Sequence, residues 1–218
     1  MMRNISPFDR LLYAFTGFTM LLIGCRMLYF GSWHYAFLAF NLFLAWIPYY
    51  LSRYFTKWRQ PWLRWGIVGA WFLFLPNAFY IVTDLIHLRH ASIVPAWLDA
   101  LIVFAAALAG MIMAFASLYR AEQFLTLYCT AWQVRVTIAG ILLASGFGVY
   151  LGRFLRWYSW DVVTQPLSLF SSVASRFAFP HEHLRTWAFT FLLAGFYGLL
   201  YAMLKKMPMV ITNIKKEG

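Results

Sequence analysis

The chain has 218 residues and is 63% apolar, with 18 Lys and Arg against 7 Asp and Glu and a formal net charge of +11. A water-soluble domain of this size could not bury 22 Phe, 11 Trp and 13 Tyr and still present a charged surface. The basic residues lie in short clusters between apolar segments, a pattern typical of membrane orientation and of contact with anionic lipid headgroups. Composition therefore predicts an integral membrane protein surrounded by membrane lipids, argues against nucleic-acid binding, and identifies no protein partner.

Six segments are long and apolar enough to cross about 30 Å of hydrocarbon, which takes about 20 helical residues. In chain order they cover residues 11–30, 33–51, 62–88, 97–119, 134–151 and 184–204. We expect an all-α fold, a polytopic membrane helix bundle of about six transmembrane helices. No linker or internal repeat divides the chain, so residues 1–218 are predicted to form a single membrane domain. Pro76 in the third span predicts a kink or a partly unwound turn.

Two connecting segments are long enough to lie along the membrane surface. Residues 120–133 mix apolar and polar side chains. Residues 168–179 place Phe170, Val173 and Phe177 at helical spacing, as an amphipathic or re-entrant helix would. We therefore expect an amphipathic segment between the fifth and sixth spans.

The Lys and Arg residues predict the orientation of the bundle. Under the six-span pattern, one side of the membrane receives Arg3, Arg10, Arg53, Lys57, Arg59, Arg64, Arg120, Arg135, Lys205, Lys206, Lys215 and Lys216. Because basic loops stay in the cytoplasm, both termini are predicted to be cytoplasmic, and in a bacterial cell this membrane would be the inner membrane. Residues 89–95 and 152–183 then face outward.

The third span carries the first group of candidate site residues. Four polar side chains fall within about 80° of one helical face at 100° per residue: Asn77, Tyr80, Asp84 and His87. Ionisable groups in a spanning helix are costly in lipid, so this stripe must face protein, water or an ion. His90 follows at the outer end of the span.

Two further polar stretches are predicted at the same membrane face. Residues 152–166 follow the fifth span and carry Arg153 and Arg156, which share a helix face, and then Asp161. Residues 180–183, with the sequence Pro-His-Glu-His, precede the sixth span. Three separate segments therefore bring Asp, His, Glu and Arg side chains to one end of the bundle.

This combination suggests a divalent metal site, for example for zinc. Asp84 and His87 form an Asp-x-x-His pair on one helical face, a spacing that can bind a metal ion. His181 and His183, or His90, are the candidates for the remaining ligands. The pattern lacks the His-Glu-x-x-His spacing of known metalloproteases.

The other charged residues suggest a reaction at a lipid-linked substrate. Asp161 and Glu182 are the candidate catalytic residues, because either could orient a metal ligand or activate water. Guanidinium groups suit a phosphate or carboxylate, as on a lipid headgroup. The predicted substrate-binding residues are Arg153, Arg156, Asn77 and Tyr80.

Each part of this cluster also has a purely structural explanation. Asp84 could pair with Arg153 or Arg156 and hold the third and fifth spans together. His87 and His90 could lie at a helix end, where the dipole favours them. A turn that begins the sixth span would explain residues 181–183.

Three other polar side chains have similar structural explanations. Asn77 could bond backbone groups freed by Pro76. Arg153 and Arg156 could reach toward headgroups beside an aromatic belt. Asn41, in the second span, suggests a hydrogen bond between helices.

The sequence LPNAFYIVTDLIHL at residues 75–88 and the sequence GRFLRWYSWD at residues 152–161 resemble a known family. The chain is similar to the bacterial integral membrane proteins grouped as domain of unknown function 1361, or DUF1361. The family blocks are LPNAPY, TDLxHL and GRFxRWNSWD, so Phe79 replaces Pro and Tyr158 replaces Asn. The resemblance implies a bacterial polytopic membrane protein and no particular activity.

Three function classes remain open from the sequence. The first is a membrane-embedded, metal-dependent enzyme that acts at the outer leaflet through the Asp, His and Arg cluster. The second is a transporter or channel component in which Asp84 and His87 relay protons or bind a cation. The third is an accessory or assembly protein whose polar cluster is structural. The lack of inverted repeats argues somewhat against transport.

Overall fold

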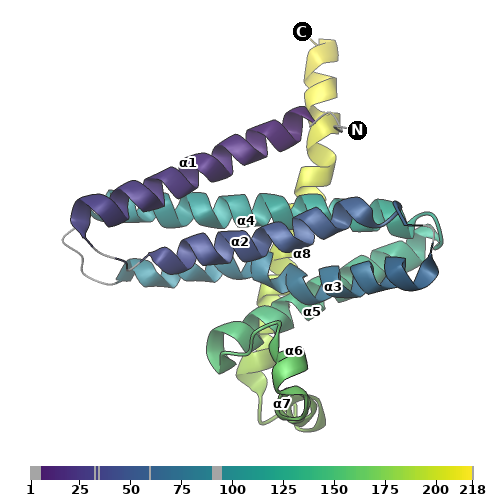
Figure 1. Cartoon of the computed structure of the whole chain (residues 1–218). Helices are drawn as coiled ribbons and strands as arrows, with labels where there is room; N and C mark the ends of the chain where they lie inside the picture. Colours follow the sequence, from purple (N-terminus) through teal and green to yellow (C-terminus); the bar gives the residue numbers. More distant parts are fainter. Residues whose placement is uncertain (1–5, 32, 34, 59, 90–94, 218) are drawn as a thin grey trace. The chain divides into compact units, whose positions relative to one another are not determined.

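The computed structural model describes residues 6–31, 33, 35–58, 60–89 and 95–217, and at residues 87, 89 and 208–217 it describes the backbone alone. All regular structure in this part of the chain is helical, as predicted (Figure 1). The chain divides into two compact units, unit 1 at Met1–Phe124 and unit 2 at Leu125–Gly218. The single membrane domain stays a prediction.

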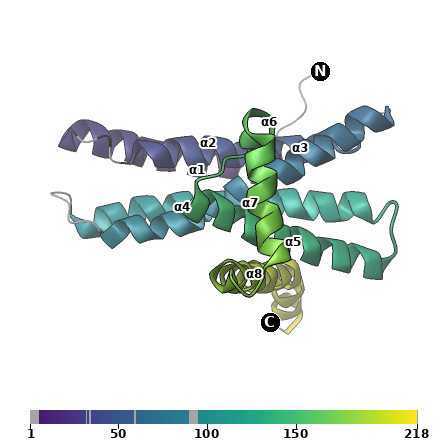
Figure 2. The same ribbon diagram turned by 90° about the horizontal axis from the view of Figure 1, so that it is seen from below.

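The described residues of unit 1 form four long helices and two 3-10 segments. They are α1 (Pro7–Phe30), α2 (Ala36–Leu51), η1 (Ser52–Tyr54), α3 (Pro61–Tyr80), η2 (Ile81–Arg89) and α4 (Ala96–Leu125). Unit 2 contains α5 (Ala131–Leu155), α6 (Asp161–Thr164), α7 (Pro166–Ala178) and α8 (Leu184–Glu217). Figures 1 and 2 show the four long helices of unit 1 running along roughly one direction.

Five helical segments in the described part of the chain are long and apolar enough to span a membrane. They are Pro7–Phe30, Pro61–Ile86, Ala96–Leu125, Ala131–Leu155 and Leu184–Met207. The remaining predicted span corresponds to α2, whose 16 residues extend about 24 Å at 1.5 Å per residue. The protein is therefore a multi-pass helical membrane protein, and its described residues hold five candidate spans and one shorter helix where six spans were predicted.

Local sequence explains where several helices begin and end. The side chain of Ser6 accepts a hydrogen bond from the Asp9 amide, Pro7 follows in the first turn, and α1 stops at Gly31 with φ +60°. Thr130 and Gln133 form a reciprocal capping box that starts α5. The predicted surface segment 120–133 is therefore wrong. Its first residues complete α4, and a short turn leads into the capped start of α5.

The change in helix type near Pro76 lies later than the sequence predicts. The α-helix continues through Pro76 to Tyr80, and the chain then tightens into the nine-residue 3-10 segment η2. The Thr83 hydroxyl donates to the Tyr80 carbonyl at 2.7 Å, which satisfies an acceptor at the end of the α-helix. The irregular backbone therefore lies beside Asp84 and not at the proline.

In unit 1, α4 approaches the backbone of α3 closely at one glycine. A Cβ atom added to Gly110 would lie 2.8 Å from the Ala78 carbonyl oxygen and 2.9 Å from the Ile81 side chain. Residues around this contact are fully buried, including Leu75, Ala78 and Met113. The glycine therefore lets two spanning helices meet at the point where α3 becomes η2.

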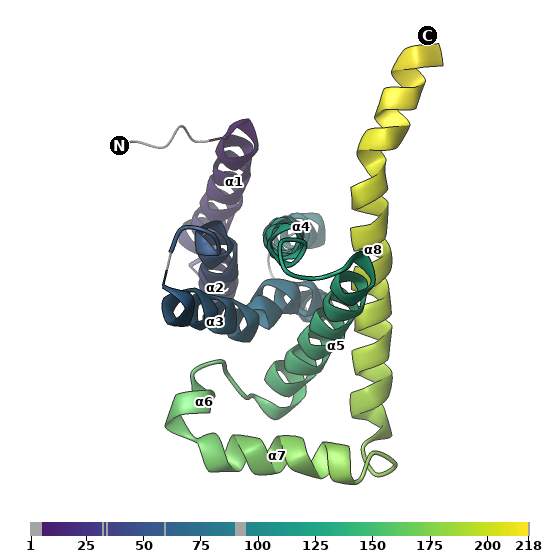
Figure 3. The same cartoon turned by 90° about the vertical axis from the view of Figure 1, so that its right-hand side faces the viewer.

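Unit 2 is organised by the packing of α5 against α8 (Figure 3). Gly146 on α5 lies against the Thr190 carbonyl of α8, because an added Cβ would be only 2.8 Å from that oxygen. The predicted amphipathic helix is present as α7, which runs across the direction of α8 in Figure 3. Leu167 and Phe170 on α7 are exposed, as expected for a helix at a membrane surface.

Candidate functional site

Asp84 is the best-enclosed member of the predicted site. Its side chain lies in η2 and has no exposed surface. The amide nitrogen of Asn41, on α2, donates to one of its carboxylate oxygens at 2.7 Å. The predicted interhelical hydrogen bond of Asn41 is thus confirmed, and its partner is the acidic residue of the third span.

The other residues of the third-span stripe lie before and after Asp84 in the sequence. Asn77 and Tyr80 are half-buried, and the Asn77 amide donates to the Phe74 carbonyl at 3.2 Å. This bond agrees with the structural explanation that Asn77 satisfies backbone groups near the proline. A 3-10 helix has three residues per turn, so backbone positions 84 and 87 lie on the same side of η2. The His87 side chain and all of His90 lie outside the described part of the chain.

The predicted residues after the fifth span belong to unit 2. Asp161 is buried, accepts a hydrogen bond from the Tyr158 amide at 2.7 Å and another from the Thr164 hydroxyl at 3.0 Å, and so orders the turn that begins α6. Arg156 is exposed and ends α5 at φ +59°. Arg153 is half-buried. These contacts give Asp161 a structural role, and its catalytic role stays a prediction.

Residues 181–183 form an open turn before α8. His181 and Glu182 have side chains 75% and 62% exposed, and the His181 ring nitrogen lies 3.8 Å from the Glu182 carboxylate. His183 is half-buried, and its amide donates to the Pro180 carbonyl at 3.2 Å. This geometry agrees with a turn that begins the helix.

The predicted metal ligands are divided between the two units, with Asp84 and His87 in unit 1 and His181 and His183 in unit 2. Among the residues that the structure describes, no three His, Cys, Asp or Glu side chains lie together as a metal-binding group. A metal site that joins the two units stays a prediction.

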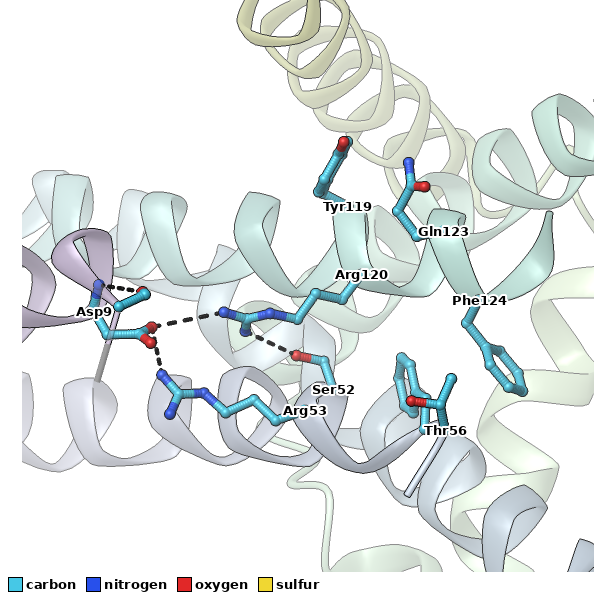
Figure 4. Close-up of a pocket in the computed structure, with 10 residues that line it drawn as sticks. Asp9, Ser52, Arg53, Thr56, Tyr119, Arg120, Gln123 and Phe124 are labelled. Carbon is cyan, nitrogen blue, oxygen red and sulfur yellow. Dashed lines mark hydrogen bonds and ion pairs between the residues drawn. The ribbon is translucent and has the colours of Figure 1, made fainter. Parts of the chain in front are cut away.

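A second polar cluster, which the sequence analysis does not identify, surrounds Asp9 at the start of α1 (Figure 4). The Tyr49 hydroxyl donates to its carboxylate, and the Arg53 guanidinium lies 2.5 Å from the same oxygen. Arg120 of α4 approaches that oxygen at 3.7 Å. One carboxylate therefore joins four elements: α1, α2, η1 and α4.

Tyr49 lies at the centre of this cluster and is fully buried. The guanidinium carbons of Arg53 and Arg120 lie 4.9 and 4.5 Å from its ring centroid. Arg120 also donates to the Ser52 hydroxyl at 3.2 Å and to the Tyr49 carbonyl at 3.3 Å. Cation–π contacts and hydrogen bonds thus fix the two arginines in place.

A pocket of about 530 Å³ opens beside these arginines. Its lining consists of Ser6, Asp9, Ser52, Arg53, Phe55, Thr56, Tyr119, Arg120, Gln123 and Phe124. Figure 4 shows the guanidinium groups of Arg53 and Arg120 directed toward Asp9, with Thr56 and Phe124 at the other end of the residues drawn. The volume is in the range of small-molecule sites, about 300–1,000 Å³.

A third polar contact joins α1 to the first turn of α4. The Arg26 guanidinium binds the Asp99 carboxylate through two contacts of 3.0 and 3.4 Å, and the two side chains are only 2% and 6% exposed. The ring of Tyr35 lies 4.4 Å from the guanidinium carbon. This paired, two-point geometry is the arrangement that makes a buried charge tolerable.

The sequence contains a signal for the Arg26–Asp99 pair and a weaker one for the Asp9 cluster. Arg26 and Asp99 lie inside apolar segments, where an ionisable residue needs a partner. One basic and one acidic residue in different spans therefore predict a pair. The Asp9 cluster has a weaker signal, because Asp9 and Arg53 lie near predicted span ends, where charges are common.

The family comparison agrees with the two sequence blocks. The family model described as "Protein of unknown function (DUF1361)" matches residues 40–200. The chain belongs to this family. The matched range includes Asn41, Asp84 and both blocks, so the resemblance to DUF1361 is confirmed. Neither a curated protein nor a solved structure matches the chain.

Proposed function

We propose that this DUF1361 protein binds a proton or a small cation at Asp84 and acts as a transporter or channel component. The observation that supports the proposal most directly is a carboxyl side chain with no exposed surface inside a candidate membrane span. Ionisable groups at membrane depth are costly and mark ion pathways and proton relays. Asp84 meets this description.

The backbone around Asp84 adds support. The α-helix ends at Tyr80, and the span continues as the 3-10 segment Ile81–Arg89. Transporters commonly bind ions where a spanning helix is interrupted, because backbone groups outside the α-helical pattern help to coordinate the ion. The Asn41 amide orients one carboxylate oxygen at this interruption.

Substitution of Asp84 by asparagine should remove the ion response of the protein with little change in side-chain shape. In thermal melts of the full-length protein in detergent, the wild type should be stabilised by lower pH or by one of Na⁺, K⁺, Mg²⁺ or Zn²⁺. A ligand at 100 times its dissociation constant adds about 2.7 kcal/mol, which a melt resolves easily. The Asp84→Asn variant should melt at the same temperature across the whole series.

Glu182→Gln is the control for the change from acid to amide, because this carboxylate is exposed and lies in unit 2. It should keep the wild-type response. An Asp84→Asn variant that still responds would contradict the proposal. A wild type that responds to neither pH nor any of the four ions would favour the accessory or assembly class.

The metal-dependent enzyme is the second candidate function. It is supported by the shared side of η2 at positions 84 and 87, which suits an Asp and His pair on one metal ion. In this proposal His181 and His183 complete the site, and Asp161 or Glu182 activates water at the outer leaflet. Elemental analysis of the purified protein tests this candidate, since the enzyme requires stoichiometric metal that Asp84→Ala and His87→Ala each remove.

We also propose that both termini face the cytoplasm, in the inner membrane of a bacterial cell. The proposal rests on the basic residues that the sequence places on one side of the spans. A reporter that works only in the cytoplasm should be active when fused after Thr56. The same reporter should be inactive when fused after Ser172, on α7. The reverse result at either position would contradict the orientation.

A further inference from the structure

The pocket beside Arg53 and Arg120 lies at one end of the helices of unit 1. It is lined by the first turn of α1, the segment that follows α2 and the last turns of α4. None of its lining residues belongs to the Asp84 stripe. It is therefore a separate site, and the function proposed for Asp84 does not depend on it.

The charge of the lining is positive. Its charged residues are one acid, Asp9, and two bases, Arg53 and Arg120. Asp9 accepts hydrogen bonds from Tyr49 and Arg53, so a single carboxylate lies between two guanidinium groups. The two arginines and one aspartate thus give the lining a net positive charge.

One donor in this lining is left unsatisfied. Arg53 Nε is buried and has no hydrogen-bond partner among the described atoms. Leaving a buried N–H of a charged group without an acceptor is costly. The hydroxyl of Thr56 and the amide of Gln123 supply further polar groups at exposed positions of the lining.

The surroundings of the pocket are typical of the membrane interface. Trp58, Trp62 and Trp65 follow η1 and are all exposed, as expected for side chains at headgroup level. Trp65 also packs against Phe124, which lines the pocket, with ring centroids 6.1 Å apart. An opening here would be reached by a lipid headgroup or by a solute from the adjacent water.

We infer that this pocket binds a phosphate-bearing anionic group, carried either by a lipid headgroup or by a soluble phosphorylated molecule. Arg53 and Arg120 hold the phosphate oxygens, since planar guanidinium groups match phosphate in charge and geometry. The buried rings of Phe55 and Phe124 close the apolar side of the pocket. Asp9 balances one arginine and leaves one charge for the ligand.

The test uses a substitution that leaves the ion pairs intact. Thr56 is exposed at the pocket, so Thr56→Glu places a competing carboxylate beside the arginines. Full-length protein in detergent is titrated with dioctanoyl phosphatidylglycerol, dioctanoylglycerol and inorganic phosphate, and binding is followed by native mass spectrometry and thermal melts. Phosphatidylglycerol should bind and stabilise the wild type. Thr56→Glu should bind it about tenfold more weakly, the factor expected for one lost charge-assisted hydrogen bond.

Thr56→Gln is the neutral control of the same size as the glutamate, and it should bind phosphatidylglycerol as the wild type does. Arg10→Gln removes an exposed charge one residue from Asp9, outside the lining, and should also have no effect. Stabilisation by inorganic phosphate as well identifies a soluble ligand, and stabilisation by phosphatidylglycerol alone identifies a lipid. Equal binding by Thr56→Glu and Thr56→Gln, or equal stabilisation by dioctanoylglycerol, would overturn the inference.

Discussion

Arg26→Met should destabilise the protein more than any other single substitution considered for unit 1. The methionine leaves the Asp99 carboxylate buried without its two-point partner. Removal of one member of a buried ion pair costs about 3–5 kcal/mol, because the remaining charge has neither water nor a counter-charge. A thermal melt in detergent measures the loss, and a large fall in the yield of folded protein would have the same meaning.

The double variant Arg26→Met with Asp99→Leu separates charge from packing. With both charges replaced by apolar side chains of similar size, much of the lost stability should return. Arg10→Met, an exposed arginine on the same helix, is the control and should melt close to the wild type. A double variant that is no more stable than Arg26→Met would show that the pair does not carry the effect.

Gly110→Ala should destabilise unit 1 by forcing α3 and α4 apart. The added Cβ would lie 2.8 Å from the Ala78 carbonyl oxygen, an atom of the backbone that cannot rotate away. Overpacking of a buried contact costs about 1–3 kcal/mol. Because Ile81 begins η2 on the other side of this contact, the substitution should also weaken the ion response attributed to Asp84.

Gly69→Ala provides the matched control on α3. An added Cβ at this glycine has no neighbour within 4 Å, so the substitution should be neutral or should stabilise the helix by about 0.5–1 kcal/mol. In the same detergent, Gly110→Ala should therefore lower the melting temperature, and Gly69→Ala should leave it unchanged or raise it. If Gly110→Ala melted at or above the wild-type temperature, the close approach of α3 and α4 would be contradicted.

Most of the fold could be predicted from the sequence because hydropathy is a local property. The helices contain the apolar segments that composition and length identify, and Asn41 hydrogen-bonds across helices as expected. The errors concern helix ends, where capping decides. Residues 120–125 extend α4, and Thr130 with Gln133 starts α5, so no separate surface segment forms between them.

The candidate site could be predicted only in part. An acid in a spanning segment can be recognised from the sequence as a candidate site residue, since lipid cannot solvate it. Asp84 is fully enclosed in the structure. The 3-10 geometry of residues 81–89 could not be predicted from the proline, because the chain keeps its α-helix for one more turn after Pro76. Gly110 packs against Ala78 and Ile81 at the point where the α-helix changes to the 3-10 segment, a contact between helices that the sequence does not reveal.

The sequence by itself determined that this is a multi-pass helical membrane protein of the DUF1361 family. Apolar segment length and the blocks at residues 75–88 and 152–161 are readable along the chain without knowledge of any contact. Only the tertiary structure decided that Asp9 meets Arg53 and Arg120, and that Arg26 meets Asp99. Arg53 lies 44 positions from Asp9, Asp99 lies 73 positions from Arg26, and Arg120 lies further still from Asp9. Pairing of distant charges depends on which helix faces meet, and helix packing sets that choice.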